Sequence, residues 1–197
     1  MTTVQATPPV QRGRPSTAER ATAYAVAAWS LAFAAVNVVQ LTTGELAEGE
    51  LAGHGTGLVV MAVLVLVLKL VAAGVALAAV RPASGPSWPL ATALWGAASL
   101  LVLYSLGNIA ITAATLSGLV EPSAAWEAAG GVTGRSLTYL VFFLAAAPLF
   151  TALALFYQRR LRPPRSALVV GIVGAPLLLG AVLGGAPGLL RALGLFP

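Results

Sequence analysis

The sequence predicts an all-α membrane protein, a polytopic transmembrane helical bundle with five spans, and three observations support this. Of its 197 residues, 58% are hydrophobic and only 9% are charged, whereas soluble domains carry about 25% charged residues. The mean hydropathy is +0.90. The apolar residues also gather in runs of about 20, the length that a helix needs to cross a bilayer. Because lipid cannot satisfy backbone polar groups, these runs should be helical and packed together.

Polar, Gly- and Pro-containing segments separate the predicted spans. The spans lie at about 21–43, 57–80, 89–112, 136–157 and 166–183. They form a bundle over residues 16–185. A polar, proline-containing stretch at 1–15 is predicted to be a disordered cytoplasmic tail, and residues 186–197 a short tail at the membrane interface.

The first helix is expected to begin at Ser16. The stretch STAE at 16–19 has capping-box spacing, in which the serine hydroxyl accepts from the Glu19 N–H and the Glu19 side chain reaches back. The apolar run that follows is long for a signal-peptide core, and no A-x-A-like cleavage site follows it at the right place. We therefore expect a retained span.

Proline and aromatic residues mark the later spans. Pro89 suits the first turn of the third helix. In the fourth span, Phe142 and Phe143 lie towards one end, and Phe156 and Tyr157 at the other. This distribution resembles the aromatic belts found at both membrane interfaces.

The fifth span is the shortest and is interrupted. Pro176 lies inside it and should kink the helix, because its ring removes one helical hydrogen bond. Gly180 and Gly184 have GxxxG spacing, which permits close helix approach. Chance matches are expected in a chain with so many small residues. If this segment does not cross the membrane, the bundle has four spans.

Lys and Arg, rather than acidic residues, set the orientation of membrane helices. With five spans, one side of the membrane holds Arg12, Arg14, Arg20, Arg81, Arg159, Arg160, Arg162 and Arg165. The other side holds Arg135 and Arg191. The N-terminus is therefore predicted to be cytoplasmic and the C-terminus outside, in a multi-pass protein of the plasma membrane.

Lys69 is the one charged residue within the predicted hydrocarbon segments. It lies about 18 Å from the outer end of the second span, at about 1.5 Å per residue. A cation at this depth costs roughly 2.5 kcal/mol or more without compensation. Four neutral polar side chains in the first and third spans reach a similar level: Asn37, Gln40, Tyr104 and Asn108.

Three interpretations of Lys69 follow. In the first, Lys69 is structural: it reaches a wet crevice, forms hydrogen bonds with these neutral groups, or loses its proton, since burial disfavours its charged form. In the second, it attracts an anionic ligand such as a lipid headgroup, a prenyl phosphate or a carboxylate. In the third, it meets an acidic group of another subunit.

Other ionisable residues lie in the segments between spans. Glu50 and the single histidine, His54, have i, i+4 spacing and are weak candidates for a metal site. A solvated acidic loop explains them better, so we expect neither a metal nor another cofactor. The chain has no cysteine, which excludes disulfides and thiol chemistry.

The basic stretch RRLRPPR supplies the candidates for contact with anionic lipid headgroups. These are Arg159, Arg160, Arg162 and Arg165. The alternative is a loop that only fixes the topology. The net charge of +5 and the pI of about 10.5 raise the question of nucleic-acid binding. Arginines gathered between spans explain this charge as a topology signal, so no nucleic-acid partner is expected.

The stretch AYAVAAWSLAFAAVNVV at 23–39, followed by further short spans, resembles small multi-span membrane proteins of unknown function from actinobacteria. The end of the first span reads VVQLTTG, where an aromatic–glycine motif would be typical of that group. The resemblance implies a bacterial membrane protein and carries no activity with it.

The function expected from these features is a non-enzymatic binding or assembly component of the membrane. Its expected partners are membrane lipids, with another membrane protein or a second copy of the chain as further candidates. The alternative is a small intramembrane enzyme or carrier for an amphipathic anionic substrate, with Lys69 in an outward-facing polar cavity. No nucleophile–base pair can be assembled, because the histidine lies in a loop.

Overall fold

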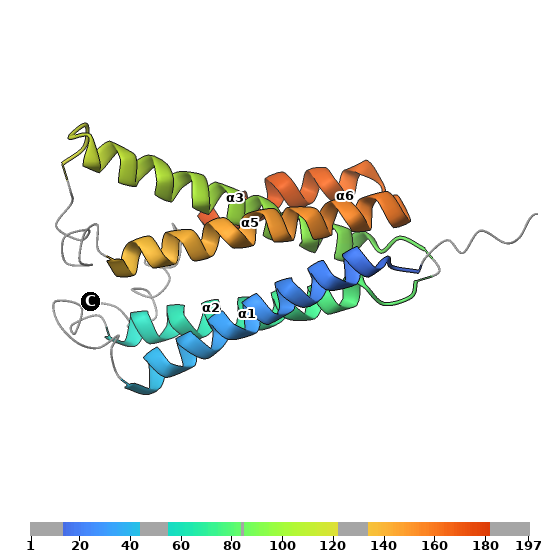
Figure 1. Cartoon of the computed structure of the whole chain (residues 1–197), viewed down its shortest axis with the longest axis horizontal. Coiled ribbons are helices and arrows are strands. Elements are labelled where there is room, and N and C mark those ends of the chain that lie inside the picture. The colour runs from blue at the N-terminus through green and yellow to red at the C-terminus, as the bar shows by residue number, and fades with distance from the viewer. Residues whose placement is uncertain (1–13, 44–54, 84, 122–133, 182–197) are drawn as a thin grey trace, which may run out of the picture.

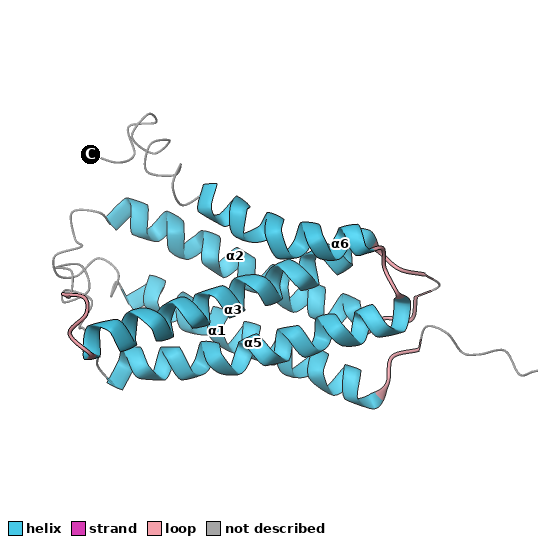
Figure 2. Cartoon of the chain, turned by 90° about the horizontal axis from the view of Figure 1, so that it is seen from above, coloured by secondary structure: helices cyan, strands magenta, loops and turns pink. Residues whose placement is uncertain are grey.

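The computed structural model describes residues 14–43, 55–83, 85–121 and 134–181. These residues are helical apart from short connections, and they contain no strand (Figure 2). The helices are α1 (Thr17–Thr43), α2 (Gly55–Ala79), α3 (Trp88–Leu116), α5 (Gly134–Leu161) and α6 (Arg165–Val169), which continues through the π-helical turn η3 (Val170–Gly174) to residue 181. The all-α prediction is confirmed for the described residues.

Four of these helices are long and apolar enough to cross a membrane. They correspond to the first four predicted spans: Thr17–Thr43, Ala62–Ala79, Trp88–Leu116 and Leu140–Leu161. The fifth predicted span corresponds to the shorter apolar helix Arg165–Ala181. At about 1.5 Å per residue, the described part of this helix, which reaches the last described residue, is about 25 Å long, compared with ~30 Å for the hydrocarbon core.

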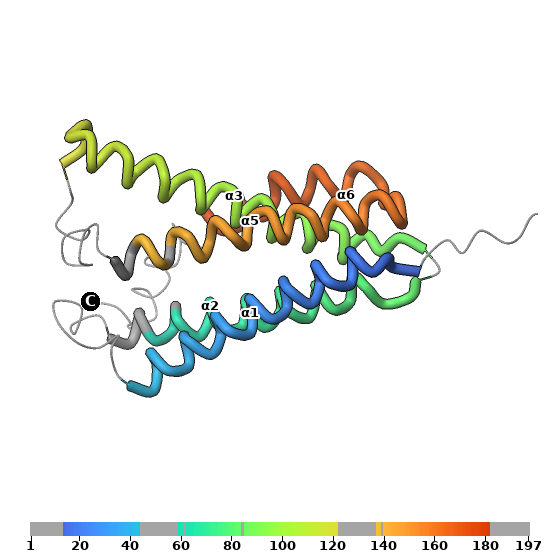
Figure 3. Tube along the Cα trace, in the orientation of Figure 1, coloured from blue at the N-terminus to red at the C-terminus, as the bar shows by residue number. Residues whose placement is uncertain are grey.

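The four long helices form two pairs. Helix α1 lies along α2, and α3 lies along α5, with α6 and η3 packed against α3 (Figures 1 and 2). The pairs meet where α1 and α3 begin and where α2 and α5 end, and we call this the closed end. They diverge toward the opposite end of the same helices, the open end (Figure 3).

Small side chains fill the core near the closed end. Alanines from all four helices allow the backbones to approach closely, as small residues do in membrane bundles. The buried alanines that these four helices contribute to the core are Ala23, Ala27, Ala73, Ala76, Ala79, Ala91, Ala98, Ala146 and Ala154, and α6 adds Ala167. Leu94 and Leu153, each almost fully buried, fill the space between them.

An ion pair joins three helices at the closed end. The Ser16 hydroxyl accepts from the Glu19 N–H at 3.1 Å, as the capping prediction expected. The Glu19 carboxylate does not complete the capping box: it pairs with Arg160 of α5, with 2.9 Å between Oε1 and Nε. Arg160 also donates from Nη2 to the carbonyl oxygen of Ala79, at the end of α2. Arg160 of α5 therefore binds the Glu19 carboxylate, which the local sequence pattern predicts to cap the N-terminus of α1.

The aromatic residues of α5 differ from the predicted interfacial belts. Tyr157 is only 2% exposed, and its hydroxyl accepts from the Ser87 N–H at 3.0 Å. Phe142 stacks on Trp29 with ring centroids 4.9 Å apart, and the Trp29 Nε1–H donates to the Phe142 carbonyl at 3.2 Å. Phe143 also packs edge-on against Trp29. Phe142 and Phe143 pack between helices because α1 offers an aromatic partner, Trp29.

The close helix contact in this bundle lies at a different glycine from the predicted one. A Cβ on Gly171 would lie 2.6 Å from the Thr92 carbonyl oxygen and 2.8 Å from Trp95 Cβ, so α3 and η3 nearly touch. A Cβ on Gly180 would meet nothing within 4 Å, and Gly184 lies outside the described residues. The GxxxG expectation at this pair is therefore not met at Gly180.

The predicted distortion at Pro176 takes the form of the π-helical turn η3, which ends one residue before Ala175. Widening the turn accommodates the missing proline N–H and the crowding of its ring against the preceding turn. Pro89 lies in the first turn of α3, as predicted, next to the N-cap Ser87.

Candidate functional site: a cavity between the two helix pairs

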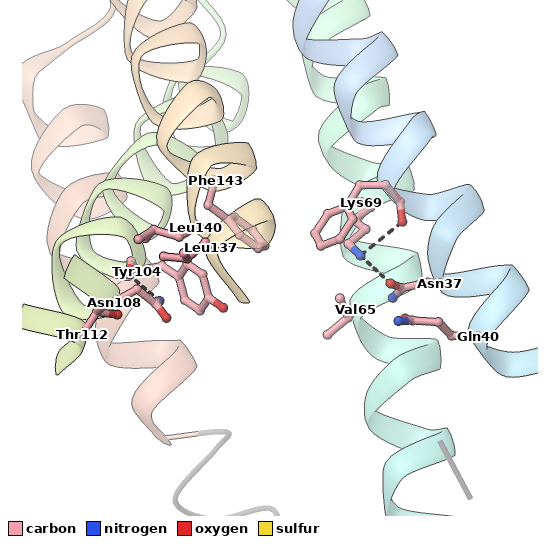
Figure 4. A pocket seen from close by; sticks show the side chains of 11 residues that line it. Asn37, Gln40, Val65, Lys69, Tyr104, Asn108, Thr112, Leu137, Leu140 and Phe143 are labelled. Atoms are coloured by element: carbon pink, nitrogen blue, oxygen red, sulfur yellow. Dashed lines mark hydrogen bonds between the residues drawn. The ribbon is translucent and has the colours of Figure 1, made fainter. Parts of the chain in front are cut away.

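The five residues proposed from sequence line one cavity of about 510 Å³. Asn37 and Gln40 come from α1, Lys69 from α2, and Tyr104 and Asn108 from α3. The cavity lies between the α1–α2 pair and the α3–α5 pair, toward the open end (Figure 4). The expected convergence of these side chains is confirmed, while ligand binding by them stays a prediction.

Six lining residues were not proposed from sequence: Phe33, Val65, Thr112, Leu137, Leu140 and Phe143. Thr112 could have been found, because it lies four residues after Asn108 and hence on the same helix face. The apolar residues carry no such signal, since every span is rich in Phe, Leu and Val. Which of them face the cavity depends on how the helices are rotated.

Lys69 forms the charged part of the cavity wall and is only 8% exposed. Its Nζ donates to Asn37 Oδ1 at 2.8 Å and to the Phe33 carbonyl oxygen at 3.4 Å. The same nitrogen lies 3.2 Å from the centroid of the Phe33 ring, within cation–π range. Asn37, one of the four partners considered for Lys69, is thus in direct contact with it.

Neutral groups compensate the buried amine of Lys69. Two carbonyl oxygens and one aromatic face attract an ammonium group. None of the three carries a negative charge that would need its own compensation. Asn37 is itself 8% exposed. Its amide nitrogen retains two N–H donors once the oxygen is used by Lys69.

The opposite wall comes from α3 and α5. The Tyr104 ring packs against Phe143 with centroids 4.5 Å apart. Asn108 donates from Nδ2 to the Tyr104 carbonyl at 2.8 Å, which orients its amide. Tyr104 is nonetheless 51% exposed, and its hydroxyl points across the cavity toward the Lys69 wall (Figure 4). A molecule in the cavity would contact both walls.

The electrostatic character of the cavity follows from its residue types. Lys69 is the ionisable cation among the described lining residues, and that lining includes no carboxylate and no histidine. The lining is therefore rich in hydrogen-bond donors and has apolar surface beside them. Such a cavity suits a ligand with a hydrogen-bond acceptor or an anionic group attached to an apolar body. Among the described residues, this lining offers no carboxylate or imidazole to act as a general base.

The weak metal candidates Glu50 and His54 lie outside the described residues. Among the residues that the structure does describe, no group of three or more His, Asp or Glu side chains could hold a metal ion. The tail at 186–197 and most of the tail at 1–15 also lie outside the described residues.

The candidate headgroup arginines divide into two kinds. Arg159, Arg162 and Arg165 are exposed near the closed end, and their contact with lipid stays a prediction. Arg160 is instead engaged inside the bundle with Glu19 and Ala79, which leaves its guanidinium turned away from the surface. Helix periodicity explains the difference, because adjacent residues point in different directions around α5.

Comparisons with protein-family models, with curated proteins and with solved structures found no match. The support for the candidate site is therefore its geometry.

Proposed function

We propose that this protein spans the plasma membrane five times and binds a small amphipathic molecule in the cavity between its two helix pairs. The binding is non-enzymatic in this proposal. One observation carries it: polar side chains from three separate helices meet in one cavity of about 510 Å³, with an ammonium group in its wall. Known pockets for small molecules enclose about 300–1,000 Å³.

The mixed lining supports an amphipathic ligand. Lys69, Asn37 and Tyr104 would hold a polar group, while Phe143 and Leu140 would contact an apolar one. Tyr104 lines the cavity although it is about half exposed, so a ligand could reach it.

A pair of valines on α2 provides a matched test. Val65 lines the cavity, while Val63 is exposed and does not belong to the lining. We expect native mass spectrometry of the purified protein to detect a bound small amphiphile that Val65→Trp removes and Val63→Trp retains. Equal retention by both variants would refute binding in this cavity.

Arginine positions support the proposed orientation. The described arginines lie near the closed end, except Arg135 in the first turn of α5. By the positive-inside rule the closed end is cytoplasmic and the cavity opens to the outside. A cysteine replacing Ala52 should then react with an impermeant thiol reagent from outside, and one replacing Arg162 should not. The reverse pattern would overturn the orientation.

The same approach decides the number of spans. With five spans, a cysteine replacing Gly194 near the C-terminus should react from outside. With four spans it should react only after the membrane is permeabilised. No other cysteine interferes, because the chain has none.

A carrier is the second candidate, favoured by the contrast between a closed and an open end. A carrier must also open toward the cytoplasm. Ala76 is fully buried near the closed end. In a carrier, a cysteine at this position should react with a reagent applied from the cytoplasmic side during turnover. In a static binding protein it should stay protected.

A further inference from the structure

The charges around the cavity narrow the chemical class of its ligand. Resting on the proposed binding function, we infer that the ligand carries a single negative charge, as an oxyanion attached to an apolar chain. A carboxylate and a phosphodiester both have this chemistry, whereas a zwitterionic headgroup and a group with two negative charges do not.

Among the described residues, Lys69 is in contact with neutral groups. Its contacts are two neutral carbonyl oxygens, Asn37 Oδ1 at 2.8 Å and the Phe33 oxygen at 3.4 Å, and the face of the Phe33 ring. These contacts stabilise the ammonium group but leave its full charge in place. The described ion pair of the bundle, between Glu19 and Arg160, lies at the closed end. A bound monoanion would make the cavity electrically neutral.

The number of negative charges that the cavity favours on a ligand follows from the number of cations in its lining. The described lining holds one cation, so a dianionic group would leave one charge uncompensated in a low-dielectric region. A zwitterionic headgroup brings its own cation, for which the lining residues that the structure describes offer no carboxylate. Both ligands should therefore bind more weakly than a monoanion.

An oxyanion in the cavity would meet several hydrogen-bond donors. The 3.4 Å contact from Nζ to the Phe33 oxygen is near the limit of a hydrogen bond, so Lys69 can exchange it for an oxyanion while it keeps Asn37. The Asn37 amide N–H groups and the Tyr104 hydroxyl supply further donors. Charge-assisted hydrogen bonds of this kind are stronger than neutral ones.

The apolar chain of the ligand would contact apolar residues of the lining. These include Val65, Leu137, Leu140 and Phe143. Val65 and Leu137 are themselves partly exposed. The chain can therefore leave the cavity along these residues toward the surrounding lipid.

The test uses the purified full-length protein in nanodiscs of phosphatidylcholine, each doped with one probe. The probes are palmitate, phosphatidylglycerol, phosphatidic acid as the doubly charged group, and a second phosphatidylcholine of different mass. Native mass spectrometry measures how much of each probe the protein retains. We expect palmitate or phosphatidylglycerol to be retained at least about tenfold more than the marked phosphatidylcholine, the effect of about one charge-assisted hydrogen bond. Phosphatidic acid should be retained less than the preferred monoanion at a pH where it carries two charges.

Two variants attribute the preference to the cavity. Lys69→Gln should abolish the preference for the monoanion, and Arg135→Gln, at the same end of the bundle, should leave it unchanged. The ratio of palmitate to phosphatidylglycerol distinguishes a carboxylate source from a phosphodiester source.

The possible failures are distinguishable. If Val65→Trp removes a bound amphiphile but zwitterionic and monoanionic probes bind equally, the cavity binds ligands and the charge inference is wrong. The inference is also wrong if Lys69→Gln retains the monoanion preference, or if phosphatidic acid binds best. If no probe responds to Val65→Trp, the proposed function itself fails. Tryptophan fluorescence during thermal unfolding verifies that each variant is folded.

Discussion

The closed and open ends are built from the same four helices, yet one is packed and the other encloses a cavity. Near the closed end, α2 contributes Ala73 and Ala76 to the core. About one to two turns further along, the same helix presents Lys69 and Val65 to the cavity. Along α5, buried Ala154 and Ala146 give way to Phe143 and Leu140.

This comparison shows how side-chain size controls the separation of helices. Alanine faces let the two pairs meet backbone to backbone. Phe33 of α1 and Phe143 of α5 hold the pairs apart where their bulky rings meet, 5.1 Å between centroids. The closed end also contains an ion pair, between Glu19 and Arg160, while at the open end the contacts of Lys69 within the described part of the chain are with neutral groups. We expect substitutions at the closed end to change stability and substitutions at the open end to change binding.

The largest expected effect comes from the ion pair at the closed end. Arg160→Met leaves the Glu19 carboxylate buried without its partner and should lower the free energy of unfolding by about 3–5 kcal/mol. Thermal unfolding in detergent micelles, followed by tryptophan fluorescence, measures the loss. The exposed neighbour offers a control, since Arg159→Met should change stability by less than about 0.5 kcal/mol. Equal stability of the two variants would contradict a structural role for the pair.

The double variant sharpens this result. Replacing both partners, with Glu19→Leu and Arg160→Met, removes the unpaired charge and should recover most of the loss. Failure to recover would indicate that the hydrogen bond from Arg160 to the Ala79 carbonyl, rather than the ion pair, holds the helices.

The next effect concerns the contact between α3 and η3. Gly171→Ala places a Cβ 2.6 Å from the Thr92 carbonyl oxygen, so the helices must separate. We expect a loss of about 1–3 kcal/mol, as for other overpacked sites. Gly180→Ala, where a Cβ meets nothing within 4 Å, is the matched control and should have little effect. The contact would be looser than described if both variants unfolded at the same temperature.

An effect of similar size is expected at the open end. Asn37→Leu removes the 2.8 Å acceptor of Lys69 and should cost about 1–3 kcal/mol, because a buried donor loses its partner. Combining it with Lys69→Met should restore much of this loss. A double-mutant cycle from the same unfolding measurements gives the coupling energy. Additive effects of the two substitutions would show that the contact contributes nothing.

The smallest effect on stability is expected at Tyr104. Tyr104→Phe keeps the packing on Phe143 and removes a hydroxyl from a half-exposed side chain, so stability should change by less than about 0.5 kcal/mol. Retention of the monoanionic probe should nevertheless fall, because one donor to the ligand is lost. A large loss of stability instead would assign the hydroxyl a structural role.

Depth along a helix made the candidate site predictable from sequence. A lysine in an apolar helix needs polar partners at its own depth in the bundle. Few polar side chains of this apolar chain lie at the depth of Lys69. Asn37, Gln40, Tyr104 and Asn108 were therefore identified before their helices were positioned, and all four line the cavity. Helix rise per residue was sufficient for this.

Rotation of each helix about its axis was not predictable in the same way. Spans that are apolar all round show no preferred face, so Phe143 and Tyr157 could equally have faced lipid. Whether Arg160 faces the bundle or the surface depends on the same rotation of α5. Its partner Glu19 has capping-box spacing, so local sequence predicts a different contact for that carboxylate.

By itself, the sequence determined the helical class, four of the membrane-compatible helices and the set of polar residues that share a depth, because length and apolarity are properties of single helices. Tertiary structure alone decided that Gly171 rather than Gly180 makes the close contact, that Arg160 is paired with Glu19, and that Lys69 forms its hydrogen bond with Asn37 at the cavity wall. These outcomes depend on how side chains from different helices fit together, and that fit is not encoded in the composition of any one span.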